Sequence, residues 1–356
     1  MIRRTGRGTL AVLATALVPV LLGGCAASGS AAQPAGPAAE LRLGYFDNVT
    51  HAPALAGLDQ GLLQDALGDT TLSSQIFGAG PAAIEALSAG AIDAAYLGPN
   101  PAVNSFVQSA GQSVRIVAGA TSGGSALVVR PGITDAGDLA GTTLATPQLG
   151  NTQDVALRSW LGEQGYATST TGGGGDVDIA PTENAQALAL FQSGKIDGAW
   201  LPEPWVSRFV IEAGATVLVD EASLWPDGAF PTTVLVVGTE FLAAHPETVD
   251  ALVAGHTASV DWLDDNPDQA AAAINRVLDA DTGKPLPDAV LARALTAVTF
   301  TTDPLAETFP VLLKAGVKAG TSKTGNLAGL FDLAPLNRVR TAAGAQPVSD
   351  AGLGTE

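Results

Sequence analysis

Short apolar runs alternate with longer amphipathic stretches over residues 41–237, a pattern typical of an α/β protein. The apolar runs predict strands at 41–46, 72–77, 124–130, 143–146 and 232–237. Beyond residue 238 the apolar spacing becomes helical. Capping residues and prolines there predict helices at 239–253, 255–264, 266–279, 287–298 and 304–318.

Two stretches of this pattern repeat each other. Residues 87–97 and 191–201 share Gly, Ile, Asp, Ala, an aromatic residue and Leu at a constant offset of 104 residues. Each copy predicts a helix, a glycine stop, a short buried strand and a proline-bent loop. The chain therefore predicts two α/β lobes of similar plan, the first from residues 41–128 and 235–340 and the second from 129–234. Two crossover strands, 124–130 and 232–237, would link them as a hinge, and a helical return would pack on the first lobe.

The strand-to-helix turns of the two lobes carry the candidate binding residues. In open α/β sheets, ligands lie outside the carboxyl ends of the strands, and pockets concentrate where lobes meet. One turn holds Asn48 and His51, and the matching turn of the second lobe holds Gly150, Asn151, Thr152 and Gln153. Free N–H groups at such helix starts bind anions. Plain helix capping is the alternative, because every helix needs a cap.

The N-terminus predicts export and lipid anchoring. Arg3, Arg4 and Arg7 precede an apolar run over 10–22 that is too short to span a membrane. Cys25, the chain's single cysteine, follows Leu-Gly-Gly and resembles the modified cysteine of a bacterial lipobox; a chance cysteine beside an ordinary cleavage site is the alternative. We expect residues 1–24 to be a signal peptide and the small, polar residues 25–40 to be a flexible tether.

Charge and composition narrow the function. The formal net charge is −18, and it becomes −21 when residues 1–24 are removed, because they hold three arginines and no acid. Such acidity argues against nucleic acid and anionic lipid headgroups as partners. Three scattered histidines and one cysteine do not make a catalytic or metal cluster. We therefore expect no catalysis, no metal and no cofactor, against the alternative of an enzyme on the same fold.

Several segments together resemble the nitrate/sulfonate/taurine family of ABC-transporter substrate-binding proteins. They are Gly44–Ala54, Gly80–Leu87, Ile92–Pro101, Thr146–Asp154 and Gly194–Trp205. The resemblance implies a type II periplasmic-binding fold that closes on its ligand by hinge motion. From their place in the predicted strands, the tight turn at Gly80 and the two proline-rich strand ends face the same cleft; the strand ends hold Gly98, Pro99, Asn100, Glu203 and Trp205. Glu203-Pro204-Trp205 is similar to the nitrate branch, whereas residues 48–53 are closer to the sulfonate branch.

The chemistry of the expected cleft favours an anion held by neutral donors. No arginine or lysine falls in a predicted cleft turn. Glu203 would repel a bare anion, so it predicts a ligand with a hydrogen-bond donor as well; the alternative is that Glu203 only shapes its loop. We expect an aliphatic sulfonate or a taurine-like compound, with nitrate, bicarbonate or an aminopyrimidine as the alternative. The expected partner is an ABC permease, and the protein is expected at the extracytoplasmic face of the cell membrane, held there by the lipid anchor. A monomer is expected, and a ligand sensor is the alternative to an importer.

Overall fold

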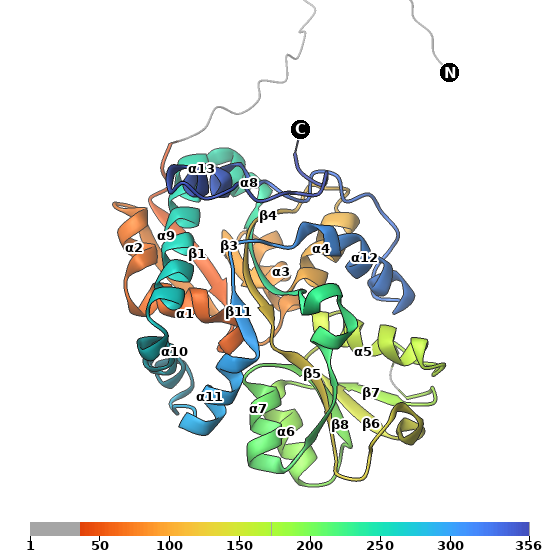
Figure 1. Cartoon of the computed structure of the whole chain (residues 1–356). Coiled ribbons are helices and arrows are strands. Elements are labelled where there is room, and N and C mark those ends of the chain that lie inside the picture. The colour runs from red at the N-terminus through yellow and green to blue at the C-terminus, as the bar shows by residue number, and fades with distance from the viewer. Residues whose placement is uncertain (1–35, 172, 356) are drawn as a thin grey trace, which may run out of the picture. The chain divides into compact units, whose positions relative to one another are not determined.

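The computed structural model describes residues 36–171 and 173–355, and its strands form two sheets (Figure 1). The first sheet has six strands, in the spatial order β11 (Val298–Phe300), β4 (Val114–Gly123), β10 (Pro231–Gly238), β3 (Ala94–Leu97), β1 (Glu40–Tyr45) and β2 (Thr71–Ile76). The second has five, in the order β7 (Asp178–Pro181), β6 (Thr143–Thr146), β8 (Gly198–Pro202), β5 (Ser125–Val129) and β9 (Thr216–Asp220).

The two sheets share one plan, and the sequence repeat lies at equivalent places in them. β1 runs parallel to β2 and β3, and β6 runs parallel to β7 and β8; β10 and β5 then pair antiparallel with β3 and β8. Asp93 precedes β3 and accepts the Arg42 N–H at 2.8 Å, while Asp197 precedes β8 and accepts the Thr143 N–H at 2.9 Å. The repeated aspartates therefore join each repeated strand to its neighbour.

Helices cover both sheets. Around the first lie α1 (Ala52–Asp59), α2 (Leu62–Leu67), α3 (Gly80–Ser88), α4 (Pro99–Gln108) and the later helices of the chain, and they enclose the largest apolar core. The second sheet has α5 (Thr152–Glu163) on one face and α6 (Asn184–Gln192) with α7 (Trp205–Ala213) on the other. Alternate residues of β5 enter the two cores, which explains why the strand is apolar throughout.

The helical return onto the first sheet is present, with different bounds. Its helices are α8 (Thr239–Ala244), α9 (Pro246–Asp265), α10 (Pro267–Thr282), α11 (Asp288–Thr296), α12 (Phe309–Lys318) and α13 (Ala334–Ala342). The break expected near residue 254 is wrong: it falls at His245, before Pro246, because proline is tolerated in the first turn of a helix and not in its interior. Val298, the last residue of the helix expected at 287–298, instead begins β11 (Val298–Phe300).

The chain passes between the sheets beside the two expected crossover strands. β5 pairs only within the second sheet and β10 only within the first. The first passage is at Gly123–Gly124, and the second runs through 221–230. Both lie a few residues before the expected lobe boundaries at 128 and 234, and the lobes as independent units remain a prediction.

Candidate functional site

A small polar cavity lies between the two sheets, at the carboxyl ends of β1, β2, β3, β6, β7 and β8. Its volume is about 20 Å³, which is room for one or two water molecules. We call it the inner cavity. Its lining residues belong to the turns that follow these strands, with Thr232 added from β10: Phe46, Asn48, Thr50, His51, Gly78, Gly98, Pro147, Asn151, Gln153, Asn184, Pro202 and Thr232. None of these residues carries a charged side chain.

His51 supplies a neutral imidazole on the side of the first sheet. Its Nδ1 accepts the Phe46 N–H at 3.2 Å, and its ring stacks on that of Phe46 with centroids 4.3 Å apart. Burial lowers the pKa of His51 to about 3, because the charged imidazolium would lose its hydration. With Nδ1 used as an acceptor, the proton of the neutral ring is on Nε2, which is therefore a hydrogen-bond donor.

The start of α5 faces the cavity from the second sheet. Asn151 is the N-cap, and its Oδ1 accepts the Thr152 N–H, while Gln153 is buried in the first turn. The preceding loop is held by Asp154, whose carboxylate accepts the Gly150 N–H at 3.0 Å and pairs with Arg158 at 2.9 Å. The fully buried Arg158 is thus neutralised by Asp154 and leaves no net cation beside the cavity.

Three contacts join the sheets around the inner cavity. Trp205 Nε1 donates to Asn48 Oδ1 at 2.9 Å, and the Asn100 N–H donates to Thr152 Oγ1 at 3.4 Å. Gly98 lies directly against Thr152: a Cβ on this glycine would be 3.2 Å from Thr152 Cβ and under 3.0 Å from Oγ1. In this structure, therefore, residues that follow strands of the first sheet touch residues of the second sheet's helices around the inner cavity.

Glu203 does not offer a free carboxylate to a ligand. It is 1% exposed and is absent from the lining of the inner cavity. Oε2 accepts the Ser207 N–H at 3.0 Å, and Oε1 pairs with Arg293 Nη1 at 3.0 Å. Burial raises the pKa of Glu203, partly offset by these two partners. These contacts fit the alternative, in which Glu203 shapes its loop, and they tie that loop to α11; the ligand contact of Glu203 stays a prediction.

Four other expected site residues lie elsewhere. Gly80 starts α3 and permits close packing on the Pro101 ring, where a Cβ would collide. Pro99 begins α4 and is buried, without lining the cavity. Asn100, together with Thr152, lines a separate cavity of about 130 Å³, and its Nδ2 donates to the Leu312 carbonyl at 3.2 Å. Trp205 lines an outer cavity of about 450 Å³ with Asp47 and Asp281.

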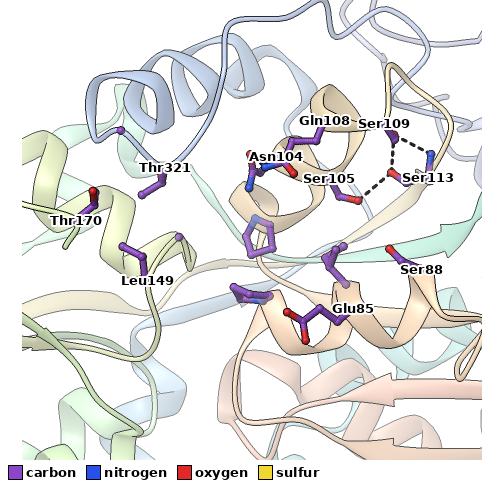
Figure 2. Close-up of a pocket in the computed structure, with 15 residues that line it drawn as sticks. Glu85, Ser88, Asn104, Ser105, Gln108, Ser109, Ser113, Leu149, Thr170 and Thr321 are labelled. Carbon is purple, nitrogen blue, oxygen red and sulfur yellow. Dashed lines mark hydrogen bonds between the residues drawn. The ribbon is translucent and has the colours of Figure 1, made fainter. Parts of the chain in front are cut away.

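Gly150 lies in a larger groove of about 650 Å³, which Figure 2 shows between α3, α4 and the loops at 149–150 and 320–321. Its α4 side carries three serines: the Ser113 hydroxyl is 2.9 Å from that of Ser105 and 3.0 Å from that of Ser109. Because these hydroxyls bond to one another, the groove has fewer free polar groups than its residue types indicate.

The sequence did not point to Asn184, which begins α6 and lines the inner cavity. It follows β7, the edge strand of the second sheet, by a short loop. The available signal was its place at a third strand-to-helix turn of the same lobe, but the four-residue strand before it ends in proline and lies shortly after the glycine run at 172–175.

The described ranges offer no candidate for a membrane span or for a metal cluster. Within 36–171 and 173–355, no helix combines the length and apolar character needed to cross a bilayer. Over the same ranges, no group of three or more His, Cys, Asp or Glu side chains could hold a metal ion. Cys25, the expected signal peptide and most of the expected tether lie outside the described residues.

Comparison with known proteins identifies the family. The taurine-binding periplasmic protein of Escherichia coli is 29% identical over 184 residues, 51% of this chain and 54% of that protein. The alkanesulfonate-binding protein SsuA of Xanthomonas axonopodis, solved with MOPS, has a TM-score of 0.66 and 20% identity over 82% of this chain and 96% of its own. The nitrate-binding protein NrtA of Synechocystis has a TM-score of 0.64 and 14% identity over 80% and 82%. These structures confirm the expected type II periplasmic-binding fold.

The family model described as the NMT1-like family matches residues 34–278. This match covers more than half of the chain and includes every named strand except β11, together with the residues that line the inner cavity. The chain therefore belongs to the NMT1-like family.

Proposed function

We propose that this protein is the solute-binding component of an ABC importer and captures a small oxyanion of the sulfonate class, either an aliphatic sulfonate or a taurine-like compound. One observation carries the proposal: the inner cavity is buried between two sheets and is lined by helix starts and neutral donors. The names of the similar taurine-, alkanesulfonate- and nitrate-binding proteins support it.

The donors of the cavity suit an anion. The first N–H groups of α5 have no acceptor within the helix, and the helix dipole adds a partial positive charge there. His51 Nε2 and the side chain of Gln153 are further groups beside the same space. No lining carboxylate repels an anion, because Glu203 and Asp154 are paired with arginines away from the cavity.

The pKa of His51 bears on the working range of the site. Because burial holds that pKa near 3, the imidazole remains a neutral donor at all ordinary pH values. Ligand affinity should therefore be flat from mildly acidic to mildly basic pH, as long as the anion itself does not titrate.

Delivery to a permease requires the protein to remain at the outer face of the membrane. We propose that Cys25 is lipidated, that residues 25–40 tether a monomeric body, and that the body closes on the ligand and docks on the permease. Cys25→Ser should move the protein from the membrane fraction to the soluble extracytoplasmic fraction, or leave its signal peptide uncleaved. Unchanged processing and membrane retention would contradict the anchor.

Calorimetry on the body from residue 36 onward tests the ligand class. Taurine, ethanesulfonate, nitrate, bicarbonate and an aminopyrimidine are titrated in parallel. A hydrogen bond to an ion is worth on the order of 1.5–3 kcal/mol, so Gln153→Ala should weaken a sulfonate about ten- to 150-fold. Gln164→Ala, at the exposed far end of α5, is the control. Binding of nitrate or the aminopyrimidine without any sulfonate would overturn the assignment.

A further inference from the structure

Asn184 has an unusual place in the inner cavity. It is only 9% exposed, and its Oδ1 has no hydrogen-bond partner in the described part of the chain. Nearly all buried polar side-chain atoms in native proteins have a partner, because burying one without a partner costs free energy. This amide therefore points to a group that the protein itself does not supply.

Asn100 Oδ1 also lacks a partner among the described residues, but Asn100 lines the separate cavity; two other amides of the inner cavity are already engaged. Asn48 Oδ1 accepts the indole N–H of Trp205, and Asn151 Oδ1 accepts the Thr152 N–H. Their carbonyl oxygens are already engaged, and their loops are thereby fixed. Asn184 lines the same cavity, and among the described residues its Oδ1 is an unengaged acceptor.

The amide is also presented by a rigid element. Asn184 is the first residue of α6, and Ala187, Leu188 and Phe191 of the same helix are buried in the core of the second sheet. An unpaired carbonyl oxygen there cannot easily turn toward solvent. Its partner must come into the cavity.

We propose that Asn184 is a specificity-determining residue, whose Oδ1 accepts a hydrogen bond from an N–H or O–H group of the ligand. The anionic group of that ligand lies at the start of α5, on the donors already described. The ligand is then a small sulfonate that carries an amine or a hydroxyl, rather than a bare anion. This inference rests on the proposed function, because it takes a sulfonate as the anionic group.

Three sulfonates of nearly the same size separate the possibilities: ethanesulfonate, its hydroxyl analogue isethionate and its amine analogue taurine. Calorimetry on the unchanged protein should show that isethionate or taurine binds at least about tenfold more tightly than ethanesulfonate, or about 1.4 kcal/mol. If none of the three binds, the proposed function fails, and this inference falls with it. If all three bind equally, only this inference fails.

Two substitutions test the residue itself. Asn184→Ala removes the acceptor and should abolish the preference, weakening only the donor-bearing ligand. Asn184→Asp keeps an acceptor, so it should keep that preference and weaken ethanesulfonate through charge repulsion. Gln186→Ala, an exposed amide two residues along α6, is the matched control and should change nothing.

The ligand-free protein gives an independent readout. Because Oδ1 has no partner among residues 36–171 and 173–355, Asn184→Ala should leave the midpoint of thermal unfolding unchanged or raise it. A clear loss of stability in Asn184→Ala would show a structural partner and overturn the inference. Equal weakening of all three sulfonates by Asn184→Ala would also overturn it, since the amide would then serve the anionic group alone.

Discussion

Gly98→Ala should act as a wedge between the two sides of the binding site. Gly98 is the N-cap of α4, with φ −69° and ψ 153°, a conformation that alanine adopts without strain. The added Cβ would nevertheless meet Thr152 at the start of α5, 3.2 Å from its Cβ and under 3.0 Å from Oγ1. These residues belong to different sheets, so the collision exists only while the two sides are in contact.

The cost follows from packing. Forcing an extra methyl into a close-packed contact typically costs about 1–3 kcal/mol. Here that cost falls on the closed arrangement, while an open arrangement relieves it. Because only the competent fraction binds, the ligand affinity should drop about five- to 150-fold. The stability of each side should change little, since α4 and its core contacts remain.

Gly238→Ala is a close control for this substitution. Gly238 is also an N-cap glycine, of α8, with φ −63° and ψ 134°, and its added Cβ would be 3.7 Å from the nearest atom, the Asp93 carbonyl oxygen. This variant should bind normally. Adding Thr152→Ala to Gly98→Ala removes Oγ1 and should recover part of the lost affinity.

Calorimetry with whichever sulfonate binds the unchanged protein measures these affinities, and small-angle scattering with saturating ligand reports closure. Wild-type affinity in Gly98→Ala would refute the reasoning, because the sheets would then not need this contact in the bound state. Equal losses in Gly98→Ala and Gly238→Ala would instead point to a general effect of replacing an N-cap glycine.

Three more outcomes are expected. Burial lowers the pKa of His256 from 6.5 to about 4. Below pH 6.5 the His256 side chain therefore binds a proton in the unfolded chain but stays neutral in the folded protein, so the free energy of unfolding falls as the pH drops. The stability advantage of the wild type over His256→Gln, measured by urea unfolding, should therefore shrink by about 2 kcal/mol between pH 7 and pH 5; a constant difference would argue against a buried neutral histidine. Arg293→Met leaves the carboxylate of Glu203 with fewer partners and should destabilise the protein by about 1–3 kcal/mol. Glu203→Gln should weaken the binding of taurine and of ethanesulfonate alike. A loss of taurine binding alone would instead support a direct contact between Glu203 and the ligand. Trp205→Phe keeps an aromatic ring but loses the hydrogen bond to Asn48. The ligand should then bind about two- to tenfold more weakly, as measured by calorimetry. Unchanged affinity would show that this hydrogen bond does not hold the closed arrangement.

Local sequence patterns were sufficient to predict the architecture. The offset-104 repeat identified β3 and β8 as equivalent strands. In both sheets the repeated aspartate accepts a hydrogen bond from a backbone N–H of the neighbouring strand. Strand-to-helix turns could also be located, because caps and prolines act within a few residues. Asn48, His51, Gly98, Asn151 and Gln153 line the inner cavity, and their contact with a ligand stays a prediction.

Distant pairing could not be read in the same way. Glu203 and Asp47 both stand at turns near the cavity in the sequence, yet Arg293, ninety residues further along, neutralises Glu203, and Asp47 faces the outer cavity instead. A carboxylate at a turn has the same local signature whether it meets a ligand, an arginine or water. Its role depends on which groups the fold brings within a few ångström, because charge interactions at that range decide what a buried carboxylate can bind.

The sequence by itself therefore determined the two-sheet plan, the helical return and the positions of the turns, because these depend on periodicity and on residues close together in the chain. Only the tertiary structure decided which turn residues share one cavity, which charges are cancelled, and that Asn184 keeps an unpaired oxygen there. Hydrogen-bond satisfaction is a property of neighbours in space, and those neighbours come from strands and helices far apart in the chain.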